Sequence, residues 1–270
     1  MTTDASSAPA PVAIVAGGAR GIGRAVALRL AERGARVAVL DIDLAAAAAY
    51  GEELTAPSVA EELVARAGEG WALQVDLTDP GAAAEAVGTV VERWGRLDAL
   101  VVTAGGAVTP YDRSRASVTT DEDLTTLLDV NVRAVVNCCR AAVPHLRATG
   151  GGAIVTTGSS AGLESAPDGS VAGYGMSKAA VQHYTRSLAR EVGQWGIRVN
   201  CIAPGVIRTS RVLAQSRATG FVDDAAAAAI PLRRQGEPED IADVAEFLTG
   251  PLSSYVSGQV IAVSGGAVTP

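Results

Sequence analysis

Tyr174 and Lys178, four residues apart, are the side chains of this sequence best suited to move a proton. They open a long helical pattern, and residues i and i+4 share one face of a helix. A free phenol has a pKa near ~10, too high for a base at neutral pH, but a nearby ammonium group lowers that value. The pair therefore predicts general acid–base chemistry, in which the tyrosine takes a proton from an alcohol or gives one to a ketone.

Lys178 is also the only lysine among the 22 basic residues, since every other one is arginine. Arginine is wider, planar and effectively never neutral, whereas the lysine ammonium is compact. A site that needs a small cation beside a phenol would resist replacement by arginine. The composition therefore supports a specific role for this lysine, with a fortuitous pair as the alternative interpretation.

A glycine-rich turn follows the first apolar run, Val12–Ala16, and leads into a helical pattern. Gly17, Gly21 and Gly23 give it the spacing G-x-x-x-G-x-G. Gly17 permits a tight turn, and the helix start offers free N–H groups and a positive dipole end to a pyrophosphate. An ordinary strand–helix turn can carry such glycines too. The position at the first strand–helix turn favours dinucleotide binding.

The second apolar run ends at Asp41, 24 residues after Gly17. An acidic residue there accepts hydrogen bonds from both ribose hydroxyls of NAD and repels the 2′-phosphate of NADP. Asp43 competes for this role but lies further from the strand end. Arg20, inside the glycine loop, could instead bind a 2′-phosphate. We expect NAD to be preferred over NADP, because Asp41 weighs more than Arg20.

Short apolar runs alternate with longer helical patterns along the chain, and runs of consecutive Val and Ala are typical of strands buried on both faces. The predicted strands are Val12–Ala16, Arg36–Leu40, Ala72–Val75, Leu97–Val102, Ala153–Thr157, Ile197–Ala203 and Gln259–Val263. The predicted helices are Gly21–Arg33, Ser58–Arg66, Pro80–Trp94, Asp121–Leu146, Gly173–Trp195 and Pro238–Thr249. This alternation predicts an α/β protein with a doubly wound parallel sheet flanked by helices.

No linker divides the chain, so we expect a frayed tail over residues 1–11 and a single domain over residues 12–270. Three weakly patterned segments, 104–120, 161–172 and 208–230, follow strands. They are expected at the carboxyl ends of the sheet, where α/β folds bind ligands, with 208–230 as a lid.

Two alanine-rich stretches, Ala45–Ala49 and Ala225–Ala229, are expected to be helical because alanine is the best helix former. The neighbouring portion Tyr50–Ala60 carries no motif that we can interpret. The role of the whole stretch from 42 to 60 therefore stays open.

The formal net charge of −7 and the pI near 4.9 disfavour a nucleic-acid partner, because phosphate binding needs a basic surface. No apolar stretch reaches the about 18 residues of a membrane span, and no signal-peptide pattern is present. Cys138, Cys139 and Cys201 are expected to be small buried hydrophobes, and the two histidines provide no metal-binding pattern. A soluble, cytoplasmic protein without a metal is expected.

The motifs together resemble the short-chain dehydrogenase/reductase family over almost the whole chain, from about Val12 to Val263. They stand in the family's order: Gly17-x-x-x-Gly21-Ile22-Gly23, Asp76-Leu77, Asp129-Val130-Asn131-Val132, Ile154-Val155-Thr156-Thr157-Gly158-Ser159, Tyr174-x-x-x-Lys178, Ile197-Arg198-Val199-Asn200, Pro204-Gly205-Val206-Ile207-Arg208-Thr209 and Gly236-Glu237-Pro238-Glu239-Asp240-Ile241-Ala242. The resemblance implies a single Rossmann-type domain and an NAD(P)-dependent oxidoreductase.

By this resemblance Tyr174 is the catalytic acid–base, while Lys178 lowers its pKa and holds the nicotinamide ribose. Ser159 would orient and polarise the substrate carbonyl or hydroxyl. Asn131 would hold a water molecule that relays protons to Lys178.

The resemblance also implies a set of cofactor contacts, which includes Tyr174 and Lys178 themselves. Its other members are Gly17, Arg20, Gly21, Ile22, Gly23, Asp41, Asp76, Leu77, Thr103, Ala104, Gly105, Pro204, Gly205, Ile207 and Thr209. Asp76 and Leu77 would flank the adenine, and Ile207 and Thr209 would bind the nicotinamide carboxamide.

The match departs from the family at three places. Ala16 stands where Thr is usual, which removes a bracing hydroxyl worth ~1 kcal/mol if it were buried. Thr103 stands in place of an Asn, so the bracing of the central sheet must differ. Ser160 competes with Ser159 for the catalytic role, and we favour Ser159 because it keeps the usual Ser-x-x-Gly spacing to Gly162.

The leading hypothesis is an NAD-dependent oxidoreductase that transfers a hydride between nicotinamide and a secondary alcohol or ketone. A second is an NADPH-dependent 3-oxoacyl or ketone reductase of the same family, which Arg20 favours and Asp41 opposes. A third, a dinucleotide-binding regulator without turnover, is disfavoured because all four catalytic residues are intact.

The resemblance also implies a homo-oligomer, a tetramer or a dimer, formed through the helices expected at 121–146 and 173–195. The substrate itself is not indicated. Arg208, Arg211 and Arg217 in the lid segment would suit an acidic substrate, although arginines on a solvated helix surface are the commoner explanation.

Overall fold

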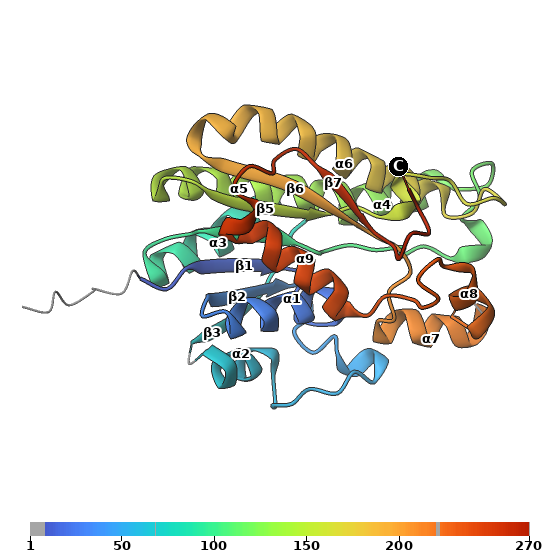
Figure 1. Ribbon diagram of the computed structural model, residues 1–270, viewed down its shortest axis with the longest axis horizontal. Coiled ribbons are helices and arrows are strands. Elements are labelled where there is room, and N and C mark those ends of the chain that lie inside the picture. The colour runs from blue at the N-terminus through green and yellow to red at the C-terminus, as the bar shows by residue number, and fades with distance from the viewer. Residues whose placement is uncertain (1–8, 68, 220–221, 270) are drawn as a thin grey trace, which may run out of the picture.

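The computed structural model describes residues 9–67, 69–219 and 222–269, and their strands form one parallel sheet (Figure 1). The sheet has seven strands in the order β3-β2-β1-β4-β5-β6-β7. The strands are β1 (Val12–Ala16), β2 (Arg36–Asp41), β3 (Gly70–Gln74), β4 (Ala99–Val102), β5 (Gly152–Thr157), β6 (Ile197–Pro204) and β7 (Val260–Val263). The order reverses between β1 and β4, so the predicted doubly wound sheet is confirmed, with a crevice expected at that point.

Helices cover both faces of the sheet. One face packs against α3 (Pro80–Trp94), α5 (Ala134–Thr149) and α6 (Ala172–Val192), and the other against α1 (Gly21–Glu32), α2 (Val59–Ala67) and α9 (Pro238–Thr249). Successive side chains of a strand point to opposite faces. Ile14 of β1 accordingly lies in the first core and Val15 in the second, both fully buried.

Polar caps fix where two predicted helices begin. The Asp79 carboxylate accepts hydrogen bonds from Gly81 N and Ala82 N at the start of α3. At α9, the backbone N–H of Glu237 donates to the Asp240 carboxylate in a capping box. Both helices begin with proline, which suits a first turn because its missing N–H has no helical partner there.

The structure differs from the sequence-based expectations at two helical segments. The helix expected at Asp121–Leu146 consists of α4 (Asp121–Leu128), a π-helical turn (η3, Asp129–Arg133) and α5. The segment expected to be irregular at 208–230 contains α7 (Ser210–Thr219) and α8 (Asp224–Ala229), which lie together at one end of the molecule (right in Figure 1).

Local side-chain caps explain why 208–230 is more regular than its weak apolar pattern suggested. Thr209 Oγ accepts a hydrogen bond from Val212 N at the start of α7, and Asp223 accepts one from Ala226 N at the start of α8. The helix expected at Ala225–Ala229 is confirmed as part of α8.

The prediction of a helix at Ala45–Ala49 is wrong. The segment forms turns and a short 3-10 helix, η1 (Ala48–Tyr50), that ends at Gly51 in the left-handed region. The Asp43 carboxylate accepts from Ala45 N and holds the chain in a turn, which outweighs the helix propensity of alanine.

Candidate active site

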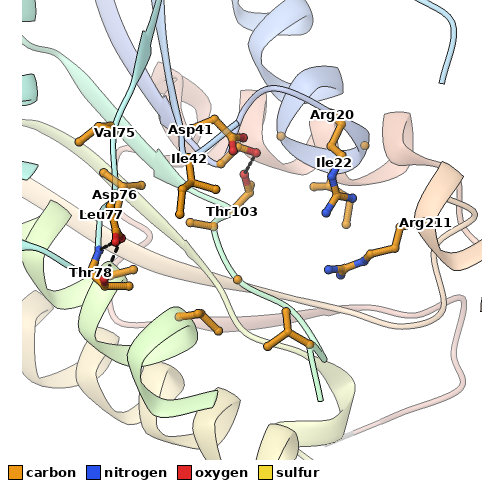
Figure 2. Close-up of a pocket in the computed structure, with 18 of the residues that line it drawn as sticks. Arg20, Ile22, Asp41, Ile42, Val75, Asp76, Leu77, Thr78, Thr103 and Arg211 are labelled. Carbon is orange, nitrogen blue, oxygen red and sulfur yellow. Dashed lines mark hydrogen bonds between the residues drawn. The ribbon is translucent and has the colours of Figure 1, made fainter. Parts of the chain in front are cut away.

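A pocket opens at the carboxyl ends of the central strands, at the point where the strand order reverses (Figure 2). Twelve of the predicted cofactor residues line it: Gly17, Arg20, Gly21, Ile22, Gly23, Asp41, Asp76, Leu77, Thr103, Ala104, Gly105 and Thr209. Tyr174, Lys178, Pro204, Gly205 and Ile207, the other predicted contacts, are not among its lining residues. Parallel sheets bind ligands at such a crevice, so the structure brings most of the predicted set to a place suited to a dinucleotide.

The glycine loop can approach a ligand closely because its glycines leave no space for a side chain. Gly17 has φ +82°, and a Cβ there would lie 2.4 Å from Ala104 N. A Cβ on Gly23 would lie 2.1 Å from the Gly17 carbonyl oxygen. Both positions therefore require glycine, and the glycine loop with the start of α1 lines the pocket, as a phosphate cradle would.

Thr103 braces this loop from β4. Its Oγ donates to the carbonyl oxygens of Ala16 and Gly17, each at 3.0 Å. Its backbone N–H and that of Ala104 also donate to the Ala16 carbonyl. The bracing that an Asn usually provides is thus supplied by a hydroxyl from the neighbouring strand, as the departure at this position led us to expect.

Asp41 ends β2 and lines the pocket, while Asp43 does not. One carboxylate oxygen of Asp41 accepts from Ala19 N at 3.0 Å, which ties the strand end to the glycine loop. Asp43 is exposed and accepts from Ala45 N. Of the two carboxylates that competed for the ribose, the structure places only Asp41 where a ligand would lie.

The Arg20 side chain, the competing determinant of NADP binding, lies over the ring of Tyr50 with its guanidinium carbon 4.9 Å from the ring centroid. Guanidinium groups favour such positions through cation–π attraction. Tyr50 belongs to the stretch without an interpretable motif, so no signal in the sequence indicated this partner.

Glu52, from the same stretch, connects three elements around the pocket. Its carboxylate accepts from Gly21 N at 3.0 Å, from Arg24 Nη1 at 3.1 Å and from Ser210 Oγ at 2.7 Å. It therefore links the start of α1 to the start of α7. Sequence reasoning missed this residue because a lone Glu in a loop carries no spacing signal.

Glu62 anchors this arrangement to α2. It is 1% exposed and accepts hydrogen bonds from Arg24 and from Thr55. Burial alone would raise the pKa of this carboxyl, but the bonds from Arg24 and Thr55 outweigh it, and the pKa is lowered. The carboxylate is thereby kept charged, and the 42–60 stretch is held against α1.

Asp76 and Leu77 lie at the far side of the pocket, after β3. Asp76 Oδ1 accepts from Thr78 N at 2.9 Å and from Thr78 Oγ at 2.7 Å, so its carboxylate closes a turn (Figure 2). The Leu77 carbonyl accepts from Asn137 of α5. This side of the pocket is thus fixed by short-range contacts and one helix.

Lys178 is buried on α6, and its Nζ donates to the Thr157 carbonyl oxygen at 2.9 Å. Burial lowers the pKa of Lys178 to about 8, and the nearby charge of Arg211 acts in the same direction. The structure therefore places the lone lysine as a buried cation against a backbone carbonyl, and the need for a compact ammonium at this position stays a prediction.

Tyr174 lies one turn before Lys178 on the same helix, and the ammonium is 5.8 Å from its ring centroid. Burial raises the pKa of Tyr174, while hydrogen bonding to Ser159 and the charge of Arg211 oppose that rise. The net effect is a raised pKa, and the expected lowering of this pKa by Lys178 stays a prediction.

Ser159 lies two residues after the end of β5 and is buried beside Tyr174. Its Oγ accepts from Ala161 N at 3.1 Å, and its carbonyl accepts from the Gln182 amide at 2.9 Å. Among the described interactions, Ser159 forms a hydrogen bond with the Tyr174 hydroxyl and Ser160 does not. The structure thus brings Ser159 and Tyr174 together, which supports the serine that we favoured.

Asn131 is fully buried in the π-helical turn between α4 and α5. Its Oδ1 accepts from Gly106 N at 2.8 Å, and its Nδ2 donates to Gly106 O at 3.1 Å. The side chain therefore fixes the loop after β4. The predicted water relay to Lys178 stays a prediction.

The loop after β6 supplies the remaining predicted contacts. Ile207 is 5% exposed, packs in the core and forms a β-bridge with Gly236, so its side chain does not face the pocket. Gly205 packs against Ser264, where a Cβ would lie 3.0 Å from Ser264 Cα. Thr209 lines the pocket opposite Gly21 and caps α7.

Arg211, two residues further on, points into the pocket and is the residue that sequence reasoning grouped with surface arginines (Figure 2). Arg208 is exposed and pairs with Glu237 at 3.2 Å. The side chain of Arg217 lies outside the described residues, as do residues 1–8 of the expected tail. The three lid arginines are therefore not equivalent.

Cys138, Cys139 and Cys201 are buried free thiols, and burial raises the pKa of each, that of Cys138 to about 12. Across residues 9–67, 69–219 and 222–269, no group of three or more His, Cys, Asp or Glu could hold a metal ion. In the same part of the chain, no helix combines the length and apolarity that crossing a membrane requires.

Comparisons with known proteins agree with this geometry. A family model described as enoyl-(acyl carrier protein) reductase matches residues 17–268. A cyclohexanol dehydrogenase of Rhodococcus sp. (strain TK6) is 42% identical over 261 residues, which cover 94% of this chain and 95% of the relative.

Solved structures are similar along the whole chain. A short-chain type dehydrogenase/reductase from Mycobacterium ulcerans superposes with a TM-score of 0.84 at 32% identity, covering 96% of this chain and 90% of that one. A 7α-hydroxysteroid dehydrogenase complexed with NADH and 7-oxo glycochenodeoxycholic acid gives 0.82 at 30% identity, with coverages of 97% and 96%. ElxO with NADP bound gives 0.83 at 25% identity, with coverages of 96% and 98%.

Proposed function

The chain belongs to the short-chain dehydrogenase/reductase family of oxidoreductases, and from this premise we propose that it interconverts a secondary alcohol and its ketone with NAD as the preferred cofactor. The name of its cyclohexanol-oxidising relative supports a secondary alcohol as the substrate class. When bound, the nicotinamide group accepts or donates the hydride. The residues of this chain supply the binding site and move the proton.

The observation that carries the NAD preference is the position of Asp41. Its carboxylate lines the pocket at the end of β2 and is held there by Ala19 N. A carboxylate at this place accepts hydrogen bonds from ribose hydroxyls and repels a 2′-phosphate. The glycine loop and the start of α1 line the same pocket as Asp41, so the residues present fit a dinucleotide.

Tyr174 is the proposed acid–base. Ser159 lies beside it and would hydrogen-bond the oxygen of the substrate, which aligns that oxygen with the phenol. Lys178 carries its positive charge below its pKa of about 8. Its positive charge would stabilise the phenolate that forms when Tyr174 gives up a proton, and its Nζ would hold the nicotinamide ribose.

Asn131 is proposed to support the catalytic residues Tyr174, Ser159 and Lys178 through the loop after β4. Its amide fixes both backbone polar atoms of Gly106. The π-helical turn places it between α4 and α5, and such turns occur frequently at functional sites. A water molecule held by this turn would complete the proton path to Lys178.

The second candidate is an NADPH-dependent ketone or 3-oxoacyl reductase, which Arg20 supports because it lines the same pocket as Asp41. Its contact with the Tyr50 ring and the charge of Asp41 both count against it. A solved neighbour binds NADP, so the family accommodates either cofactor.

We also propose a cytoplasmic homo-oligomer, a tetramer or a dimer, built through the α4–α5 and α6 helices, and one domain with 208–230 as its lid. The family resemblance supports the assembly. Gel filtration tests it, because elution at the mass of one 27.2 kDa chain would contradict an oligomer.

The experiment for the proposed function measures NADH or NADPH absorbance when the protein is mixed with NAD or NADP and a panel of cyclic and open-chain secondary alcohols. We expect turnover with at least one cyclic alcohol and a higher kcat/KM with NAD than with NADP. A higher kcat/KM with NADP would support the second candidate. If the protein binds NADH or NADPH but turns over no alcohol or ketone, the hypothesis of a dinucleotide-binding regulator would replace that of an enzyme.

A further inference from the structure

Arg211 is a cation in the pocket for which the described residues provide no acidic partner. Its side chain lines the pocket, and among the described ion pairs none includes it. Its Nε is buried and has no hydrogen-bond partner. Burying a charged group without a partner costs free energy, so such an arginine is typical of a site that binds an anion.

Neighbouring cations make this positive charge less favourable still. Burial lowers the pKa of Arg211, and the charge of Arg20 acts in the same direction. Lys178 also lies within electrostatic range of Arg211. Three cations thus converge on one region, and an anion bound among them would relieve their repulsion.

The first turn of α7 holds Arg211 in place. Thr209 Oγ accepts from Val212 N, and Ser210 Oγ donates to Glu52, so the residues on either side of Arg211 are fixed. The contact between Glu52 and Gly21 N ties this turn to the glycine loop. The backbone from which the Arg211 side chain extends is therefore held in place by hydrogen bonds to Glu52 and within α7.

Gly106 provides the surface on which the guanidinium lies. A Cβ on Gly106 would be 2.5 Å from both terminal nitrogens of Arg211, so any side chain at this position would displace the guanidinium. Asn131 fixes this glycine through both of its backbone polar atoms. The position of Gly106 beneath the guanidinium is thus fixed by Asn131, a buried residue of the proposed catalytic set.

We propose that Arg211 binds an oxyanion of the ligands that occupy the pocket, through the paired donors of its guanidinium. A planar guanidinium matches two oxygens of a carboxylate or of a phosphate. Two sources supply this chemistry: the pyrophosphate of the dinucleotide, or a carboxylate carried by the substrate. Arg211 lies within electrostatic range of Tyr174, so a substrate carboxylate would be held close to the reacting oxygen.

This inference rests on the proposed function, because both sources presuppose a dinucleotide and an alcohol in one pocket. The test compares Arg211→Met, which removes the charge, and Arg211→Lys, which keeps the charge but not the paired donors. Arg208→Met is the matched control, since Arg208 lies three residues away, exposed and paired with Glu237.

Two dissociation constants separate the sources without requiring turnover. The first is for NADH, measured by its fluorescence. The second is for unreactive carboxylates, cyclohexanecarboxylate and linear homologues, binding to the enzyme–NADH complex. If the anion is the pyrophosphate, Arg211→Met raises the first constant about tenfold or more. If it is a substrate carboxylate, the first constant stays within about twofold and the second rises about tenfold or more.

Arg211→Lys is expected to retain part of the lost affinity, because the charge remains. The proposal is overturned if both constants for Arg211→Met stay within about twofold of the wild type, if no carboxylate binds and NADH affinity is unchanged, or if Arg208→Met has the same effect. A failure of the proposed function would give a different result: wild-type protein that binds NADH but oxidises no alcohol.

Discussion

The two ends of the pocket differ in charge and in the way they are built. The acidic end, at β2 and β3, carries Asp41 and Asp76. The Asp41 carboxylate accepts a hydrogen bond from Ala19 N of the glycine loop, and the Asp76 carboxylate accepts one from Thr78 N, two residues further along the chain. The basic end, at α6 and α7, carries Arg211, whose Nε is buried, and close to it Lys178, which is buried and does not itself line the pocket. Neither has a carboxylate partner among the described ion pairs.

This difference indicates that the two ends do different work. The ribose hydroxyls of NAD can donate hydrogen bonds to carboxylates at the acidic end, because a carboxylate can accept several hydrogen bonds at once. Buried cations favour negative charge that develops or binds beside them, which suits a phenolate and an oxyanion. We therefore assign binding selectivity to the acidic end and proton transfer to the basic end.

The largest effect is expected at the basic end. Tyr174→Phe removes the hydroxyl that takes the proton, and we expect kcat to fall by about 10²- to 10⁴-fold. The steady-state rate of alcohol oxidation measures it. Tyr255→Phe is the matched control because Tyr255 is fully exposed. Normal turnover by Tyr174→Phe would contradict the assignment of proton transfer to this end.

Lys178 tests whether the basic end needs a compact ammonium. Its Nζ is buried against the Thr157 carbonyl, and a guanidinium would not fit there without displacing neighbours. We expect Lys178→Arg and Lys178→Ala to lose activity to within about tenfold of each other, a difference of ~1.4 kcal/mol. Normal kcat/KM in the arginine variant would show that charge alone is sufficient.

The same lysine makes stability depend on pH. Burial lowers its pKa from 10.5 to about 8. Between these values the unfolded chain binds more protons here than the folded chain, so the free energy of unfolding contributed by Lys178 rises with pH across that window. The unfavourable contribution, on the order of 3 kcal/mol, is fully present below about pH 8 and relieved by about pH 10.

Chemical denaturation of the wild type and Lys178→Met at about pH 7 and about pH 10 measures this contribution. The difference between the two proteins matters, because Tyr174 and the cysteines titrate in both of them and cancel. We expect the wild type to gain stability relative to the variant as the pH rises. A constant difference would show that the lysine is solvated rather than buried.

The smallest of these effects is expected at the acidic end. Asp41→Asn keeps an acceptor for Ala19 N but removes the charge that repels a 2′-phosphate. We expect the ratio of the dissociation constants for NADPH and NADH to fall by about tenfold, with little change in kcat. Asp43→Asn is the control, and an equal shift in both variants would remove Asp41 from the selectivity.

The sequence predicted the sheet well because its strands are continuous apolar runs buried on both faces. Val12–Ala16, for example, has the same bounds in the structure. The glycine loop was predictable for a related reason, since its glycines form a local motif: Gly17 has φ +82°, and Gly23 lies against the Gly17 carbonyl within a single strand–turn–helix unit. Short-range rules are sufficient for both features.

The features that the sequence did not predict depend on contacts between distant segments. Glu52 reaches Gly21 and Ser210, which are 31 and 158 residues away, and no local spacing indicates either pairing. Arg211 belongs to a weakly patterned segment, so only its position over Gly106 separates it from exposed arginines such as Arg208. The pKa of Tyr174 rises because of burial, which a motif does not reveal.

The most direct test follows deuterium from the carbinol carbon of a secondary alcohol when the wild-type protein reacts with NAD. We expect deuterium in the NADH that forms, an equal amount of ketone, and loss of both products in Tyr174→Phe while its affinity for NADH is kept. A wild-type protein that binds NADH but transfers no deuterium from any alcohol of the panel would contradict the proposed oxidoreductase chemistry.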